Sequence, residues 1–330
     1  MTSLIVRAGL LAATLGLLAC GDDTGGAGGA GGGSGGSTST GEATTGSTSS
    51  SAGGGDAGSG GAGGGAAELE TLLATDWSLE PGTETYLCQR VTLDEDLWVS
   101  EFHPLIPEGT HHTVVTLVES GEVPDGTRDC TNPFEGGFDQ IYGTGVGTEP
   151  LILPDGVAVK IPAGKQIVMN LHLFNVGADT LEGTSGILVK TADPEVIEHE
   201  ADSELWGKVD FAIEPNGTTT QTQSCVVESD LSLFSLLPHM HTMGRHLSFT
   251  LTRQDGEEIV LHDEAYDFDA QVNRPFDPPV EIAAGDTVTI ECTWDNPTNE
   301  TVGFGESTTE EMCFAGLFVY PAGQFFCPLF

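Results

Sequence analysis

The sequence predicts an all-β protein built from two β-sandwiches, and three observations lead to this fold class. After Pro81, few stretches carry a helical period for more than two turns. Short segments with alternating apolar residues are instead separated by stretches rich in turn residues. One turn-and-strand unit, residues 161–175, is also echoed at residues 282–296 with a constant offset. A turn followed by an alternating strand can look alike by chance, but the echo favours two related domains.

The individual strands follow from the same patterns. Residues 166–174 alternate between two faces, and Asp255-Gly256 is a strong hairpin signal between two apolar segments. The expected strands cover residues 91–102, 113–118, 166–174, 247–252 and 258–262. Residues 68–74 are the exception, and we expect a short helix there. With a boundary in the polar stretch 193–202, the two domains would cover residues 68–197 and 198–330.

The first 67 residues precede this β-sheet body. Residues 1–19 carry one arginine and then an apolar run that is short for a membrane span. Leu17-Leu18-Ala19-Cys20 is typical of a lipobox, so we expect a bacterial lipoprotein signal peptide with Cys20 as the lipid-accepting residue. An ordinary cleaved signal is the alternative. Residues 20–67 are almost wholly Gly, Ser, Thr and Ala, which predicts a disordered linker.

Composition narrows the location and the partners. The chain would be exported and lipid-anchored, facing the periplasm or the cell surface, and Gly21 after the lipidated cysteine favours the outer membrane. Six of the seven cysteines follow the linker, and an even number in an exported protein indicates three disulfides. A formal charge of −40 argues against nucleic acid as a partner, because phosphate binding needs clustered Lys and Arg.

Five histidines are candidate metal ligands. His239 and His241 point to the same side of an extended segment, where two imidazoles can grip a transition metal. A histidine pair at the end of a hairpin is the alternative. His111 and His112 face opposite sides of a regular strand, so they can share a metal only at a bend, a bulge or a strand end. His172 lies inside an expected strand and is placed to complete a three-histidine site.

Met312, next to Cys313, adds a thioether to this inventory. Thioethers are soft ligands that copper uses far more than zinc does. Two imidazoles and one thioether would leave a coordination position open for oxygen. Simple core packing is the alternative for a methionine at this position.

In their order along the chain, these motifs resemble the copper type II, ascorbate-dependent monooxygenases, the family of the peptidylglycine α-hydroxylating and dopamine β-monooxygenases. The resemblance extends over residues 84–327. It rests on the segments Glu84–Cys88, His111-His112, Asn170–His172, His239–Arg245 and Gly305–Cys313.

The resemblance implies two antiparallel jelly-roll domains in tandem, each with one copper ion, facing each other across an open, solvent-filled cleft. His111, His112 and His172 match the ligands of an electron-transfer copper. His239, His241 and Met312 match the catalytic copper that binds dioxygen, with ascorbate or a similar compound as reductant. By position, three cysteine pairs match disulfides of the family: Cys88–Cys130, Cys225–Cys327 and Cys292–Cys313.

Three positions depart from the peptide-amidating members, which hold the peptide carboxylate with Arg, Asn and Tyr. Here those positions are Leu237, Phe314 and Gly316, which cannot pair with a carboxylate. We therefore expect a dicopper monooxygenase that uses O2 to hydroxylate an aliphatic C–H bond of a small, fairly apolar molecule. The alternatives are a copper-binding surface lipoprotein without turnover, serving metal capture or electron transfer, and a purely structural β-protein. The remaining histidines, His103, His199, His246 and His262, are expected to be structural or superficial.

Overall fold

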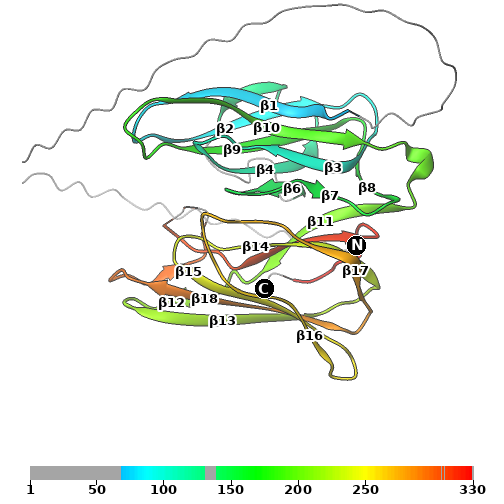
Figure 1. Cartoon of the computed structure of the whole chain (residues 1–330), viewed down its shortest axis with the longest axis vertical. Coiled ribbons are helices and arrows are strands. Elements are labelled where there is room, and N and C mark those ends of the chain that lie inside the picture. The colour runs from blue at the N-terminus through cyan, green and yellow to red at the C-terminus, as the bar shows by residue number, and fades with distance from the viewer. Residues whose placement is uncertain (1–67, 131–138, 306, 308, 329–330) are drawn as a thin grey trace, which may run out of the picture. The chain divides into compact units, whose positions relative to one another are not determined.

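The structure is a computed structural model that describes residues 68–130, 139–305, 307 and 309–328 (Figure 1). The expected signal peptide, the lipidation site at Cys20 and the linker lie outside the described residues. Within the described ranges, no helix has the length and apolar character needed to cross a membrane.

Strands and turns make up this body, which confirms the all-β prediction; the helical element described is one short 3-10 turn, η2 (Pro194–Val196). The first half contains the strands β1 (Glu70–Leu79), β2 (Glu84–Thr92), β3 (Leu97–Leu105), β4 (Thr110–Glu119), β5 (Gly126–Asp129), β6 (Gln140–Thr144), β7 (Leu151–Ile152), β8 (Val157–Ile161), β9 (Lys165–Phe174) and β10 (Leu181–Thr191). The second half contains β11 (His199–Gly207), β12 (Ala212–Ile213), β13 (Gly217–Val226), β14 (Leu231–His239), β15 (Gly244–Thr252), β16 (Glu258–Ala265), β17 (Arg274–Ile282), β18 (Thr287–Asn296), β19 (Val302–Gly303) and β20 (Phe314–Tyr320).

The helix expected at residues 68–74 is wrong, because this segment opens strand β1. Leu73, Thr75, Trp77 and Leu79 are buried in alternation, and this period of two becomes visible only beyond the expected helix. Pairing with β10 along the strand then supplies the backbone hydrogen bonds. The segment 91–102 is likewise two strands, since β2 and β3 are separated by a turn. The hairpin around Asp255-Gly256 is confirmed as β15 paired with β16.

Two sandwiches share one long sheet. Nine strands form this sheet, ordered β1-β10-β3-β8-β11-β20-β14-β17 with β7 beside β3. The five-stranded sheet β5-β2-β9-β4-β6 encloses one apolar core against its first half, and the four-stranded sheet β13-β18-β15-β16 encloses another against its second half. Strand β11 joins the halves, because it pairs parallel with β8 and antiparallel with β20 (Figure 1).

The internal echo is a structural equivalence. Residues 165–174 and 287–296 are strands β9 and β18, which occupy corresponding places in the two sandwiches. Asn175 and Asn296 are fully buried, and the Oδ1 of each accepts the N–H two residues further on, at 2.9 Å in both cases. Each side-chain amide also donates to the carbonyl four residues further on, at 3.0 and 2.8 Å. Both asparagines therefore close the same turn, which chance resemblance of two strands does not explain.

Glu204 on β11 gives the fold a pH dependence. Burial, together with the carboxylates of Asp202 and Asp139, raises the pKa of Glu204 from 4.5 to about 7. The folded chain then binds this proton more tightly than the unfolded chain, so stability falls as pH rises from about 4.5 to 7. We expect Glu204→Gln to stabilise the fold at pH 8 by on the order of 1–2 kcal/mol, after allowance for partial exposure.

Urea unfolding at pH 4.5 and pH 8 measures this effect. The free energy of unfolding of Glu204→Gln should equal that of the native chain at pH 4.5 and exceed it at pH 8. Glu228→Gln, at an exposed site, should leave the free energy of unfolding unchanged at both pH values. An equal gain at both pH values would contradict the assignment to Glu204 titration.

Candidate metal centres

The first centre is a group of three histidines on two neighbouring strands. His111 and His112 lie on β4, and His172 lies on β9. The register between these strands shifts between Thr110 and His112, so a bulge allows adjacent histidines to face one point. The Nδ1 atom of His112 is 3.0 Å from that of His111 and 3.4 Å from that of His172.

This geometry fits a metal ion. With metal–nitrogen bonds of about 2.0–2.1 Å, both nitrogen separations are short enough for one ion to bind both atoms of each pair. Burial, and then the neighbouring histidines, lower the pKa of His111 to about 4 and that of His112 well below its usual value. The imidazoles are therefore neutral near pH 7 and present lone pairs, the form in which histidine binds a metal.

Two residues outside the group fix its third ring. Glu84 accepts a hydrogen bond from Nε2 of His172 at 2.7 Å, which leaves Nδ1 as the ligand atom. Tyr86 stacks on the same imidazole, with ring centroids 4.3 Å apart and planes within 7°. A carboxylate that holds a ligating histidine in this way sets its tautomer and raises its basicity. Both residues lie in a motif quoted above, but the sequence alone assigned no role to either.

The second centre lies at one end of the second sandwich. His239 is the last residue of β14, His241 follows in the next turn, and Met312 precedes β20. Nδ1 of His241 donates to the carbonyl of Glu310 at 3.0 Å, and Nδ1 of His239 donates to Oε1 of Gln271 at 2.8 Å. Donation through Nδ1 leaves Nε2 as the nitrogen of each ring that can bind a metal. Burial lowers both pKa values, that of His239 to about 3.

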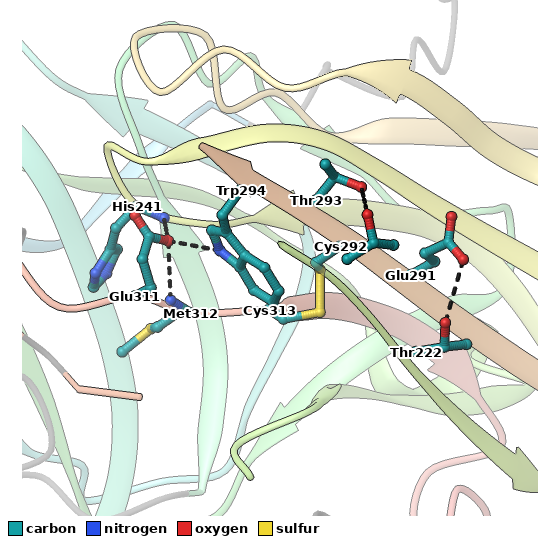
Figure 2. Close-up of a disulfide and its surroundings, with 10 residues drawn as sticks. Thr222, His241, Glu291, Cys292, Thr293, Trp294, Glu311, Met312 and Cys313 are labelled. Carbon is teal, nitrogen blue, oxygen red and sulfur yellow. Dashed lines mark hydrogen bonds between the residues drawn. A yellow bond between two sulfur atoms is a disulfide. The ribbon is translucent and has the colours of Figure 1, made fainter. Parts of the chain in front are cut away.

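Glu311 connects the ligand-bearing segments of this centre (Figure 2). Its side chain is fully buried and accepts N–H bonds from His241 at 3.0 Å, Met243 at 2.6 Å and Trp294 Nε1 at 3.0 Å. Burial raises its pKa to about 7 although these donors pull the pKa down. One carboxyl group thus holds the His-x-His turn, strand β18 and the segment of Met312 together.

All three disulfides have the expected pairing. They join Cys88 to Cys130, Cys225 to Cys327 and Cys292 to Cys313. The last of these ties β18 to the residue directly after Met312, as Figure 2 shows. The methionine is therefore fixed covalently on one side and through Glu311 on the other.

One cavity of about 80 Å3 touches both centres. Its lining includes His112 from the first centre and His239, His241 and Met312 from the second. Leu237, Gly316, Leu205, Phe318 and Val114 make most of the remaining wall apolar. The continuous nine-stranded sheet and the segment around Gln271 connect the two halves beside this cavity. The wide, solvent-filled cleft implied by the resemblance stays a prediction.

The three expected pocket residues differ in position. Leu237 and Gly316 line the cavity, with an added Cβ on the glycine 3.3 Å from that of Leu237. Phe314 lies outside this lining in the described chain; it is buried and packs edge-on against Phe304 with centroids 5.8 Å apart.

The remaining histidines lie outside both groups. His103 pairs with Glu101 at 2.8 Å, His246 with Asp263 at 3.0 Å, and His199 stacks on Tyr320. His262 is buried within β16.

Gln271 is the site residue that sequence reasoning missed altogether. Its backbone N–H donates to the carbonyl of Val146 at 3.1 Å, and its carbonyl accepts the hydroxyl of Thr148 at 2.8 Å. Its side chain then reaches His239. A loop glutamine carries no local motif, so only the folded chain reveals this link between the halves.

Fold and site together define an all-β protein with one group of three histidines whose ligand atoms lie within 4.8 Å of one another, and with a second histidine pair that lines one cavity together with Met312. Residues 205–327 match the family model for the copper type II ascorbate-dependent monooxygenase C-terminal domain. A human DBH-like monooxygenase protein 2 is 27% identical over 77% of this chain and 56% of its own length. A tyramine beta-hydroxylase from Caenorhabditis briggsae is 33% identical over 29% of this chain and 17% of its own length.

These matches show that residues 205–327 are similar to the copper type II ascorbate-dependent monooxygenase family. The names of the relatives, a DBH-like monooxygenase and a tyramine beta-hydroxylase, agree with that similarity. The chain spans about half the length of the human relative. Among solved structures, the major capsid protein P2 from bacteriophage PM2 aligns at 9% identity and a TM-score of 0.30, over 77% of this chain and 100% of that one. A score this low supports no conclusion.

Proposed function

We propose that this protein holds two copper ions and hydroxylates an aliphatic C–H bond of a small, fairly apolar molecule with O2 and a one-electron reductant such as ascorbate. The observation that carries the proposal is the shared cavity, whose wall contains residues of both histidine groups. An apolar molecule in it would contact the oxygen-binding group and lie beside the electron-supplying one. If the three-histidine group stood alone, without a second metal centre that leaves a coordination position open, it would fit metal storage instead.

Copper bound at these groups would supply the electron transfer and the dioxygen chemistry, with His111, His112 and His172 as ligands of the relay ion and His239, His241 and Met312 as ligands of the oxygen site. The protein supplies orientation and exclusion of water. Glu84 and Gln271 hold imidazole rings, and the apolar wall holds the substrate away from bulk solvent.

The cavity limits the substrate. Its volume of about 80 Å3 is smaller than the roughly 150 Å3 of an apolar protein cavity that holds benzene. Leu237 and Gly316 offer no partner for a carboxylate. The substrate is therefore a compact apolar group, and a peptide ending in glycine does not fit the chemistry of the wall.

Export completes the proposal. The apolar run of residues 1–19 and the lipobox ending at Cys20 support a lipid-anchored protein outside the cytoplasm. The three disulfides agree with an oxidising compartment. Mass spectrometry of the mature chain tests this part: an N-terminal diacylglyceryl cysteine supports it, and an unmodified Cys20 contradicts it.

Coupling of oxygen uptake to product tests the function. The copper-loaded chain, given ascorbate and a panel of small hydrocarbons, alcohols and amines, should consume one O2 for each hydroxylated product. Two bound copper ions without any coupled product would favour a copper-binding protein without turnover. Less than one metal ion per chain would favour a structural protein.

Narrowing the cavity should change substrate selection. A valine at position 316 places its Cβ 3.3 Å from Leu237 and its methyl groups in the cavity. We expect Gly316→Val to lower kcat/KM at least about tenfold for the largest accepted substrate and less for the smallest. Copper content should stay unchanged. An equal loss of kcat/KM for every substrate would indicate that the substrate binds outside this cavity.

A further inference from the structure

The three-histidine group also borders a second and larger cavity. This outer pocket has a volume of about 600 Å3 and reaches both His111 and His172, whereas His112 lines the smaller cavity. Its wall includes Glu84, Glu108, Phe174, Val176, Phe268 and Asp269. The volume lies within the range of about 300–1,000 Å3 that is usual for small-molecule sites. A molecule there would meet the first centre without entering the shared cavity.

The pocket has an exposed apolar mouth. Phe174 and Val176 remain 42% and 80% exposed, which is high for large apolar side chains. Phe268 lies against the imidazole of His111, with ring centroids 4.9 Å apart. Grouped apolar side chains at the entrance of a concave site indicate ligand binding. An aromatic ring would stack well on this surface, close to a ligand of the first centre.

The charge of the pocket is one-sided. Glu84, Glu108 and Asp269 contribute carboxylates, and none of the described residues in its wall is a lysine or an arginine. The whole chain adds a formal charge of −40. An anion entering this pocket would be repelled, while an uncharged or cationic aromatic molecule would not, and a cation would gain from the ring of Phe268.

We propose that the outer pocket binds the electron donor, and that this donor is an uncharged or cationic aromatic reductant of the hydroquinone or aromatic amine type. The inference rests on the proposed function. The ascorbate anion would still reduce the protein in collisions, without a saturable site. Copper held by His111, His112 and His172 would accept one electron from the donor in each visit, and the donor would leave as its one-electron oxidised radical.

The electron count agrees with the reaction. A hydroquinone also releases one proton to water in that step. Two donor molecules therefore supply two electrons and two protons, which together with O2 and R–H give R–OH and H2O. Each donor leaves the pocket before the next arrives.

Binding to the copper-free chain tests the pocket apart from activity. Isothermal titration calorimetry would use hydroquinone as the neutral probe, benzylammonium as the cationic probe and ascorbate as the anion. Hydroquinone and benzylammonium should bind at one site and compete with each other, and added salt should weaken benzylammonium. Ascorbate should neither bind nor compete. Saturable ascorbate binding that displaces hydroquinone would overturn the proposal.

Charge reversal gives the second test. The double variant Glu108→Lys/Asp269→Lys, at exposed positions, should weaken benzylammonium at least about tenfold and raise the rate at which ascorbate reduces the copper-loaded chain by a similar factor. Glu122→Lys/Glu228→Lys makes the same charge change at exposed sites outside the pocket and should alter neither value more than about twofold. Equal effects of the two double variants would refute the proposal that the outer pocket binds the donor.

The two levels of the proposal fail in different ways. If no probe binds but ascorbate still drives coupled hydroxylation, the outer pocket is wrong and the proposed function stands. If the probes bind but the copper-loaded chain makes no product, the pocket binds aromatic molecules without serving a monooxygenase, and the donor role is wrong.

Discussion

Met312→Ile is expected to reduce hydroxylation by at least about 100-fold while copper stays bound at the three histidines. Even residues that only support a metal ligand usually cost 10–100-fold when replaced, and this residue offers the thioether itself. Isoleucine has a similar apolar volume, so the buried position should lose less than about 1.5 kcal/mol of stability. Product formation and copper content, measured on one preparation, check both statements.

His172→Ala is the matched variant for the other centre. It should abolish electron supply from reductant, and it should leave the second group with His239, His241 and Met312 in place. The two variants therefore lose activity for different reasons and retain different copper ions. Full hydroxylation by Met312→Ile would remove the oxygen-site assignment altogether.

Glu311→Ala should be the most destabilising single change near the second centre. The substitution leaves buried N–H groups of His241, Met243 and Trp294 without their acceptor, at about 1–3 kcal/mol for each donor. We expect a total loss of about 3–5 kcal/mol after partial relaxation. Because the same carboxyl group orders the His-x-His turn and the Met312 segment, copper affinity of this centre should fall as well.

Glu310→Gln provides the control for that prediction. Glu310 is exposed, and its contact with His241 runs through the backbone carbonyl, which the substitution keeps. Urea unfolding should show little change for this variant, about 0.5 kcal/mol or less. Glu311→Gln retains the side-chain volume and one acceptor oxygen. Its loss of stability should lie between that of Glu311→Ala and that of Glu310→Gln. A Glu311→Ala loss no larger than that of Glu310→Gln would contradict the bracing role.

The sequence predicts local features of the site well. A bulge or bend was required for His111 and His112 to share a point, and the register shift on β4 is that bulge. The alternation of residues 166–174 places His172 on strand β9. Both inferences depend on the period of a strand, which a short window of sequence contains.

What the sequence does not predict arises from long-range pairing. Strand β11 joins the halves through β8 and β20, partners that lie about forty residues before and over a hundred after it, and no local pattern encodes this choice. The shared cavity follows from that continuity and from the loop of Gln271. The helix expected at residues 68–74 failed because the window ended before the alternation of β1 became clear.

X-ray absorption at the copper edge tests the central claim most directly, because it counts copper and reads the ligands together. The reduced, copper-loaded chain should hold two copper ions, both with nitrogen ligands. Only one of them should have a sulfur ligand. In Met312→Ile the sulfur signal should vanish while the histidine signal persists. A single copper ion per chain, or a sulfur signal unchanged by the substitution, would contradict the account.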